Sequence, residues 1–189
     1  MLIEFCTSGD HIANIVYSSY STNFGPVLTA WHGKVLCFVA FLEHYSTDSV
    51  IARIKKSFPK AILTYSNDTP NTFICQPEKI LLIGTPFQHK VWRALSELKP
   101  REIITYSTLA ARIGHPRAVR ATATAVGANP ISYIIPCHRV LPASGGIGLY
   151  HWGEDIKLKI LKHEGSLPQR HIKYHHKSKA HSHAYSCDI

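Results

Sequence analysis

Cys137 is the residue of this chain best placed to do covalent chemistry. It stands in the sequence Pro-Cys-His-Arg-Val at residues 136–140, with an imidazole and a guanidinium as its next two neighbours. Cationic neighbours stabilise the thiolate, which is the nucleophilic form of cysteine, and a histidine can remove the thiol proton. The pattern therefore predicts a nucleophile at Cys137. An isolated Cys-His pair is also typical of a buried thiol at a strand end, so the surrounding elements must decide.

The positive charge of the chain is concentrated around this cysteine. The 189 residues carry a formal net charge of +9. Residues 1–78 contribute −1, residues 79–165 contribute +7 and residues 166–189 contribute +3. A basic region of this kind favours a polyanionic partner such as nucleic acid, although a solvated basic surface would have the same composition.

The composition is that of a soluble protein. The first residues show no basic segment followed by an apolar one, and no apolar run approaches the roughly 20 residues that a membrane span needs. The five cysteines are odd in number and have no C-x-x-C spacing, which argues against a disulfide framework and against a zinc knuckle. We therefore expect a cytoplasmic protein in a reducing compartment.

The first part of the chain is predicted to be an α/β domain. Two apolar strands, residues 27–31 and 35–42, flank a His32-Gly33 turn as in a β-hairpin. Thr47 or Asp48 is expected to cap the helix that follows. No residue of this part suggests a chemical role.

A linker is expected between this domain and the next. Residues 64–78 are polar and contain proline, which is typical of a linker. The predicted division is residues 1–78 as an α/β N-terminal domain with its linker, residues 79–165 as the domain that carries Cys137, and residues 166–189 as a basic, His-rich tail without fixed structure.

Beyond the linker, helix signals alternate with turns. The sequence Thr-Pro-Phe-Gln at residues 85–88 has the form of a capping box with proline in the first turn, and it predicts a helix that ends at Lys99-Pro100. Ser107 is expected to cap a short helix that Gly114 ends, and Pro116 is expected to begin another. Two helices joined by a short glycine-containing turn are the pattern of a helix-turn-helix.

The second of these helices, predicted over residues 116–127, is rich in alanine and threonine. Recognition helices usually read the major groove with long polar side chains. The minor groove is only about 6 Å wide, whereas a helix with average side chains is about 10–12 Å across. A helix of small residues can approach a widened minor groove, and Arg120 can then enter the base stack. Close packing against another helix would favour the same small residues.

With these features the chain resembles the O6-alkylguanine-DNA alkyltransferase family, the methylated-DNA–protein-cysteine methyltransferases, and its bacterial members most. The Pro-Cys-His-Arg-Val element is the most specific part of the likeness. The segments that carry it, in consistent order, are Gly-Thr-Pro-Phe-Gln at 84–88, Ile-Thr-Tyr-Ser-Thr-Leu-Ala at 104–110, Gly-His-Pro-Arg-Ala-Val-Arg-Ala at 114–121, Ala-Asn-Pro at 128–130, Ile-Pro-Cys-His-Arg-Val at 135–140, Gly-Leu-Tyr-His-Trp-Gly at 148–153 and Leu-Lys-His-Glu-Gly at 161–165.

The resemblance implies a fold, a reaction and a partner. The implied fold is an RNase H-like α/β N-terminal domain followed by a mostly α-helical, winged-helix-like DNA-binding domain with a helix-turn-helix. The implied reaction is DNA repair, in which the alkyl group on O6 of a guanine flipped out of duplex DNA passes irreversibly to Cys137, once per molecule. The sequence leaves open whether O4-alkylthymine is accepted. The implied partner is double-stranded DNA that contains O6-alkylguanine. No cofactor is expected, and the protein is expected to be monomeric and to associate with the nucleoid when bound to DNA.

The resemblance also assigns catalytic roles. A thiol of pKa about 8.5 is mostly protonated at neutral pH, so His138 would take its proton through a water while Glu164 holds the imidazole. Tyr106 would crowd the target's 3′ phosphate, hydrogen-bond the flipped base and give a proton to the departing guanine. Asn129 would join the recognition helix to the active-site segment.

Further residues would contact the DNA and the base. Arg120 would fill the gap that the flipped base leaves in the stack. The residues expected along the DNA are Arg117, Ala118, Ala121 and Ala123. The residues expected to bind the guanine are Val140 and His151, through backbone groups together with that of Cys137, and Tyr150.

Departures from the family pattern bear on the site. His151 stands where bacterial relatives often carry arginine in Tyr-Arg-Trp-Gly, although the implied contact uses the backbone. Ser132-Tyr133 differs from the proline-containing version of some members, which would alter the tolerance for bulky O6 adducts. Residues 1–78 show no clear counterpart of the zinc ligands of some animal members, so no required metal is expected. The tail, with its five histidines at positions 171, 175, 176, 181 and 183, would bind metal adventitiously.

Two other functions compete with repair. A non-repairing alkyltransferase-like protein would bind DNA with a silent Cys137. A cysteine hydrolase would use Cys137, His138 and Glu164, but it gives no role to the alanine-rich helix or to the basic charge. Glu164 also has an ordinary explanation as a carboxylate at a helix end.

Overall fold

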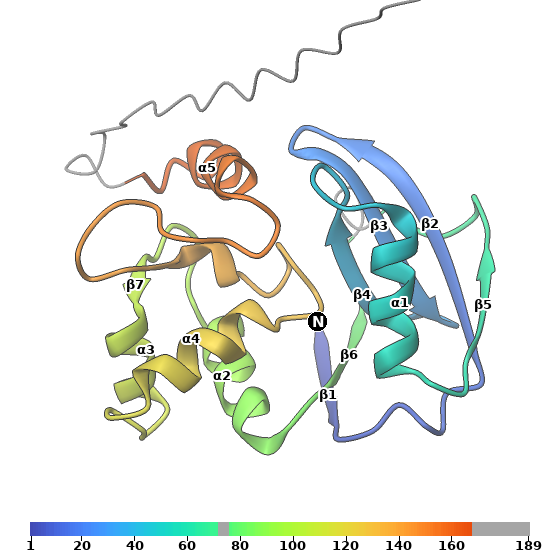
Figure 1. Ribbon diagram of the computed structural model, residues 1–189, viewed down its shortest axis with the longest axis horizontal. Coiled ribbons are helices and arrows are strands. Elements are labelled where there is room, and N and C mark those ends of the chain that lie inside the picture. The colour runs from blue at the N-terminus through green and yellow to red at the C-terminus, as the bar shows by residue number, and fades with distance from the viewer. Residues whose placement is uncertain (72–75, 168–189) are drawn as a thin grey trace, which may run out of the picture.

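The computed structural model describes residues 1–71 and 76–167. An α/β N-terminal half lies beside a C-terminal half made mostly of helices, as Figure 1 shows. Part of the predicted linker and almost all of the predicted tail, with its histidines, lie outside the described residues.

A six-stranded sheet forms the N-terminal half. The strands in chain order are β1 (Leu2–Cys6), β2 (Asn14–Thr22), β3 (Gly25–His32), β4 (Val35–Phe41), β5 (Ile62–Tyr65) and β6 (Lys79–Ile83). They lie side by side in the order β1-β6-β4-β3-β2-β5, with β2, β3 and β4 antiparallel and the other pairs parallel. The predicted hairpin is confirmed as β3 and β4, in which Val27 pairs with Phe41.

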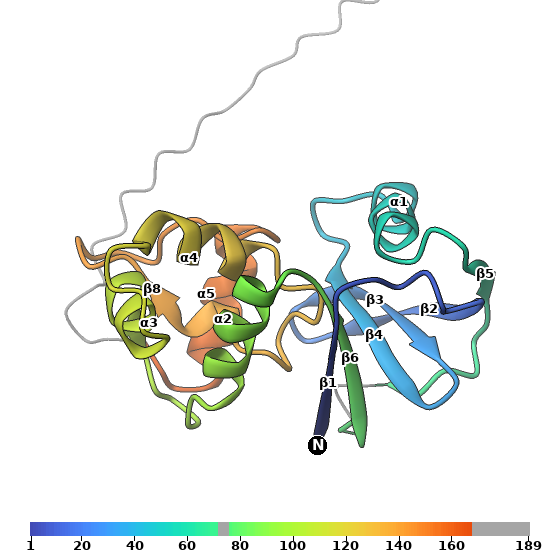
Figure 2. The same ribbon diagram turned by 90° about the horizontal axis from the view of Figure 1, so that it is seen from below.

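The helix α1 (Thr47–Ser57) covers one face of this sheet, as Figure 2 shows. It buries Val50 and Ile54 against the sheet. Its cap differs from the prediction: the Ser46 side chain accepts the hydrogen bond from the Ser49 amide, so Thr47 is already helical. Serine caps well because its hydroxyl reaches the third amide of the helix.

The sheet extends past residue 78, where the sequence predicts the boundary. Strand β6 (Lys79–Ile83) pairs with β1 and β4 and is buried at its centre. Its Ile-Leu-Leu-Ile sequence is that of a parallel strand buried on both faces. Such a strand forms only because it pairs with two strands that are distant in the sequence. Turn and cap residues near β6 do not reveal this pairing. The C-terminal half therefore begins after Ile83.

The C-terminal half packs its helices beside the β1 side of the sheet. Its elements are α2 (Pro86–Ser96), β7 (Ile104–Thr105), α3 (Tyr106–Arg112), α4 (Val119–Gly127), a 3₁₀ helix (Cys137–Arg139), β8 (Val140–Leu141) and α5 (Glu154–His163). The capping box that begins α2 is confirmed, with the Thr85 and Gln88 side chains each bonded to the other's backbone. Strands β7 and β8 pair in parallel.

Two predicted helix starts in this half are wrong. The cap of α3 is Thr105, whose hydroxyl accepts the Thr108 amide, rather than Ser107. Helix α4 begins at Val119 rather than at Pro116, because the Ala118 amide closes a separate turn onto the His115 carbonyl. Proline suits the start of such a turn as well as the first turn of a helix, so sequence alone does not distinguish them.

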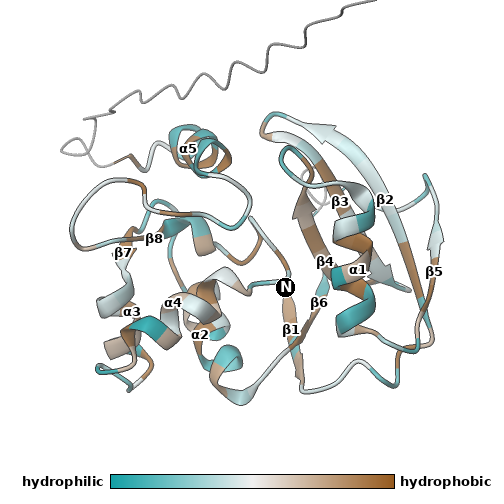
Figure 3. Cartoon of the chain, viewed as in Figure 1, coloured by the Kyte–Doolittle hydropathy of each residue, from teal (hydrophilic) through white to brown (hydrophobic). Residues whose placement is uncertain are grey.

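One apolar core runs through both halves. Figure 3 shows hydrophobic residues along the central strands β3 and β4 and in parts of the helices. The segment after α4 joins the sheet directly, since Val39 of β4 bonds to the Pro130 carbonyl and accepts from the Ser132 amide. None of the helices in the described part of the chain is long and apolar enough to cross a membrane.

Candidate active site

Cys137 borders a cavity of about 740 Å³ in the C-terminal half. The first residue of α3, Tyr106, forms one wall, and residues 123–127 of α4 form another. The loop over residues 148–152 closes the cavity and includes Tyr150 and His151. Five of the predicted site positions thus meet around the predicted nucleophile: Tyr106, Ala123, Asn129, Tyr150 and His151.

The Cys137 thiol is buried and protonated at rest. Only 4% of the residue is exposed. The Asn129 side-chain amide donates to Sγ at 3.2 Å, and the Tyr150 hydroxyl lies 3.7 Å from Sγ. Burial raises the pKa of Cys137, and the hydrogen bonds with Asn129 and Tyr150 only partly offset this effect. A thiol in this environment needs a base before it can attack.

Asn129 fixes the loop that carries the thiol. It is buried just after the end of α4, and its Nδ2 also donates to the Ile135 carbonyl at 2.9 Å. Its Oδ1 accepts the Ile131 amide at 3.1 Å. One amide side chain therefore ties both ends of the turn before Cys137 to the sulfur itself.

His138 is held by Glu164 from behind the thiol. Its Nε2 lies 3.1 Å from Glu164 Oε1, and the imidazole is fully buried. Burial lowers the pKa of His138 despite the opposing effect of Glu164, so the ring is neutral near pH 7 and can accept a proton. Its Nδ1 is buried and has no hydrogen-bond partner among the described residues, and no direct bond joins it to Cys137.

Arg139 completes this arrangement on the far side of the carboxylate. Its guanidinium grips Glu164 with two bonds, Nη2 to Oε1 at 2.7 Å and Nε to Oε2 at 3.1 Å. Burial tends to raise the pKa of Glu164, but the bonds from His138 and Arg139 outweigh it and lower the pKa to about 2. Glu164 caps α5, yet its side chain is only 11% exposed and points inward, unlike an ordinary carboxylate at a helix end.

The ionised Glu164 is expected to make the fold sensitive to acid. Its folded-state pKa is about 2 and its ordinary value is 4.5, so the folded state binds fewer protons between these pH values. The stabilisation is present above about pH 4.5 and is lost as the pH falls toward 2. Glu164→Gln should lower the thermal unfolding midpoint at neutral pH by a few degrees, and circular dichroism should show this difference shrinking through that acid range. A difference that stays constant with pH would contradict this assignment.

Tyr106 is a protonated phenol at the cavity wall. Burial raises its pKa, and the nearby Cys137 adds to the effect. Tyr150 behaves in the same way, with a pKa raised well above the ordinary value, chiefly by burial. Both hydroxyls therefore carry a proton in the cavity at neutral pH.

Two features of the site are not predicted from the sequence. Lys157 on α5 is fully buried and donates from Nζ to the Val140 carbonyl at 2.9 Å. Burial lowers the pKa of Lys157 to about 8, which Cys137 opposes by stabilising the positive charge. The spacing of the sequence could have indicated its burial. Lys157 stands three residues before Ile160 and four before Leu161, so it falls on the apolar face of the helix. The other feature is the pairing of Arg139 with Glu164, because the sequence indicates Arg139 only as a cationic neighbour of the thiol.

Val140 lies apart from the cavity wall. Its side chain is buried in the core, and its carbonyl already accepts the bond from Lys157. Among the predicted substrate-binding residues, Tyr150 and His151 border the cavity and Val140 does not.

The predicted DNA-binding residues divide between the two sides of α4. A second hollow, of about 650 Å³, is lined by Arg117, Ala118, Arg120 and Ala121 together with the first turn of α2. Arg117 and Arg120 are exposed there. Ala123 faces the Cys137 cavity instead, because it stands two residues after Ala121 and so points to another side of the helix.

Known proteins resemble this chain in the C-terminal half and over most of its length. Residues 86–166 match the pattern of the family described as 6-O-methylguanine DNA methyltransferase, DNA binding domain. The methylated-DNA–protein-cysteine methyltransferase of Methanosarcina acetivorans is 49% identical over 156 residues, which cover 79% of this chain and 98% of that protein. The crystal structure of Mycobacterium tuberculosis OGT in complex with DNA superposes with a TM-score of 0.63 at 32% identity and covers 80% of this chain and 93% of that one.

Other relatives are longer than this chain. The regulatory protein ada of Salmonella typhimurium is 33% identical over 175 residues, which cover 85% of this chain and 48% of that protein. The chain spans about half the length of the first curated relatives it matches.

Proposed function

Because the chain belongs to the O6-alkylguanine-DNA alkyltransferase family, we propose that it repairs DNA by moving the alkyl group from O6 of a damaged guanine onto Cys137. The observation that carries this proposal is the position of the thiol. Cys137 Sγ lies at a cavity beside α4, where Asn129 and Tyr150 contact it and the neutral base His138 stands next in the chain. The exposed Arg120 projects from the same helix.

The first step is loss of the thiol proton. His138 Nδ1 has no protein partner in the described part of the chain, so it is free to accept a proton, and we propose that a water carries it from Sγ. The imidazole then becomes positively charged, and the ionised Glu164 at 3.1 Å stabilises that charge. Arg139 keeps Glu164 ionised and oriented, so the base remains fixed during the transfer.

The second step is the transfer itself. The thiolate attacks the alkyl carbon, a sulfur–carbon bond forms, and the bond from that carbon to O6 breaks. The electron pair passes into the guanine ring, which takes up a proton, and the Tyr106 phenol is the proposed donor because it remains protonated at the cavity wall. Guanine is restored, and Cys137 becomes a thioether, which is a poor leaving group. Each molecule therefore acts once.

The arrangement of α3 and α4 supports DNA as the partner. We propose that α3 and α4 act as a helix-turn-helix of winged-helix type, with β7 and β8 as the small sheet behind them, and that the N-terminal half is RNase H-like. The small side chains Ala118 and Ala121 would lie along the minor groove, with Arg117 near the phosphates. We further propose that the protein works as a monomer on double-stranded DNA in the cytoplasm.

The proposal is tested by measuring how much O6-methylguanine in the DNA is converted to guanine. A duplex carrying one O6-methylguanine is incubated with increasing protein and digested to nucleosides. The expected result is that O6-methylguanine converts to guanine and that the yield stops at one conversion per protein molecule. Binding without conversion would support a non-repairing DNA-binding protein. Continued conversion beyond one per protein would support a hydrolase and refute the transfer.

Replacing Arg120 is expected to slow the repair of duplex DNA more than the reaction with a free alkylated base. A base must leave the stack before its O6 can reach a buried thiol, and Arg120 is the exposed cation on α4 nearest in sequence to Ala121. Arg120→Ala should slow repair of a duplex by about 10–100-fold, since unstacking costs a few kcal/mol, and should leave the reaction with free O6-benzylguanine within about twofold. Arg117→Ala, in the turn just before α4, is the matched control, and it should mainly weaken binding. Equal losses on duplex and free base would refute the flipping role of Arg120.

A further inference from the structure

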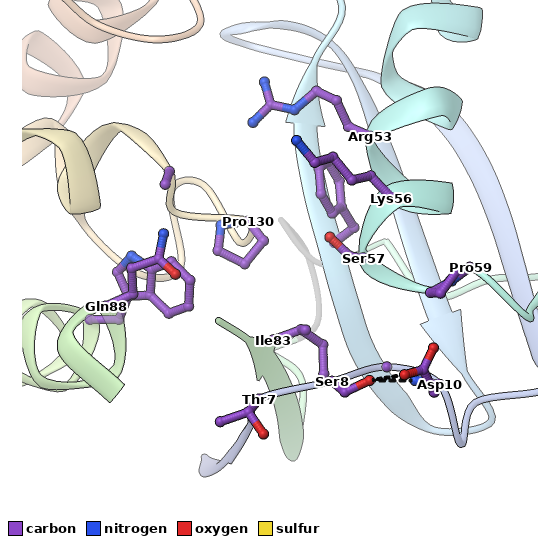
Figure 4. Close-up of a pocket in the computed structure, with 14 residues that line it drawn as sticks. Thr7, Ser8, Asp10, Arg53, Lys56, Ser57, Pro59, Ile83, Gln88 and Pro130 are labelled. Carbon is purple, nitrogen blue, oxygen red and sulfur yellow. Dashed lines mark hydrogen bonds between the residues drawn. The ribbon is translucent and has the colours of Figure 1, made fainter. Parts of the chain in front are cut away.

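Arg53 of the N-terminal half reaches across to the wall of the active site. It projects from α1, and its Nη1 contacts the Nε2 of His151 in the loop that borders the Cys137 cavity. Figure 4 shows Arg53 extending from α1 toward the C-terminal half, at the edge of a cavity of about 580 Å³ between the two halves. Its guanidinium carbon lies 5.0 Å from the centre of the Trp152 ring, so it also makes a cation–π contact with that ring.

Tyr45, just before α1, holds the same loop by its backbone. Its hydroxyl donates to the His151 carbonyl at 2.8 Å. Its ring stacks on the His151 ring at 5.4 Å and meets the Trp152 ring edge-on at 5.2 Å. Two side chains of the N-terminal half therefore fix both the backbone and the side chains of two consecutive residues on the cavity wall.

The contact requires an uncharged residue at position 151. Burial and the Arg53 guanidinium lower the pKa of His151 to about 4, so its imidazole is neutral near pH 7 and its Nε2 can accept from Arg53. No carboxylate in the described part of the chain forms an ion pair with Arg53. An arginine at position 151 would bring two cations together in a half-buried place, where like charges repel strongly.

We propose that Arg53 and Tyr45 are positioning residues for alkyl transfer, and that Arg53 and His151 form a matched pair that sets the cavity wall relative to Cys137. The inference rests on the proposed transfer reaction. It gives the N-terminal half a defined task, because the loop over residues 148–152 is held from α1 and the segment before it. A wall displaced by a fraction of an ångström would misplace the alkyl carbon, and such errors cost rate more than affinity.

Charge substitutions at both members of the pair test this proposal. His151→Arg should reduce the transfer rate at saturating duplex by about tenfold, because it repels Arg53. The double variant Arg53→Glu with His151→Arg should return the rate to within about threefold of the wild type, since a glutamate can pair with the new arginine. The dissociation constant for duplex DNA should stay within about twofold throughout, because neither side chain borders the hollow lined by Arg117 and Arg120.

Lys56→Glu is the matched control for the charge change. Lys56 lies one turn after Arg53 on α1 and borders the same interdomain cavity, as Figure 4 shows, but it is exposed. It should leave the transfer rate unchanged with either histidine or arginine at position 151. Thermal unfolding of every variant separates a loss of fold from a loss of positioning.

The outcomes distinguish this inference from the proposed function. An inactive wild-type protein in the same assay would refute the alkyl transfer. Alternatively, the wild type is active and the effects of Arg53→Glu and His151→Arg on the rate simply add in the double variant. That result would leave the transfer reaction standing and overturn the matched pair. Tyr45→Phe provides a second measurement that does not depend on charge, because it removes only the bond to the His151 carbonyl. It should slow transfer by several-fold without weakening DNA binding, and an unchanged rate would overturn the role of Tyr45.

Discussion

Cys137→Ser is expected to abolish alkyl transfer and to leave DNA binding intact. The serine hydroxyl is a far weaker acid and nucleophile than the thiol, and neutral His138 is too weak a base to ionise it appreciably. Loss of the nucleophile from an enzyme costs up to about 10⁶-fold in rate, and a decrease of at least about 10⁴-fold is expected here. Single-turnover repair of a duplex with O6-methylguanine measures the rate, and fluorescence anisotropy measures the affinity.

Cys6→Ser is the matched control for this substitution. Cys6 is a partly exposed thiol at the end of β1, and it does not line the cavity. Its replacement should leave the transfer rate within about twofold of the wild type, as expected of surface substitutions. Residual transfer by Cys137→Ser at a rate comparable with Cys6→Ser would show that another residue accepts the alkyl group.

His138→Gln is expected to slow transfer by about 10²–10⁴-fold at neutral pH, which is the usual contribution of a general base. Glutamine preserves a hydrogen-bonding side chain toward Glu164 but cannot accept the thiol proton. Because burial raises the pKa of Cys137, the variant must rely on the small fraction of thiol that ionises without help. That fraction increases with pH, so the variant should recover relative to the wild type as the solution becomes alkaline.

The pH profile of single-turnover rates checks this assignment of His138. The ratio of wild-type to variant rates should fall steadily above neutral pH. His163→Gln, which changes an exposed histidine at the end of α5, should follow the wild-type profile. A deficit in His138→Gln that is the same at every pH would assign His138 to packing rather than to proton transfer.

Local signals in the sequence predicted the elements that depend on near neighbours. The capping box at Thr85 and Gln88 and the hairpin around Gly33 are confirmed, because caps and tight turns are formed by residues a few positions apart. The start of α4 differs from the prediction, since Pro116 suits a turn and a helix equally. Strand β6 belongs to the N-terminal sheet rather than to the predicted second domain, and local signals miss this because its partners β1 and β4 are distant in the chain.

In the candidate site, too, the sequence predicts residues that lie in motifs but not contacts between distant elements. The resemblance named Cys137, His138 and Glu164, and the structure brings His138 and Glu164 within hydrogen-bond distance. Neither Lys157, buried beneath Val140, nor the contact of Arg53 with His151 could be read from motifs. Both depend on packing between elements far apart in the sequence, and the contact of Arg53 joins the half without chemical motifs to the half that carries them.

The most direct test of the central claim is the mass of the peptide that contains Cys137. The protein is incubated with excess duplex carrying O6-methylguanine, digested, and compared with a sample incubated with undamaged duplex. The proposed mechanism predicts that this peptide gains the mass of one methylene group, as hydrogen on sulfur is replaced by methyl, in nearly every molecule, and that fragmentation places the gain on Cys137. An unmodified Cys137 peptide in a sample whose O6-methylguanine has been converted to guanine would contradict the mechanism.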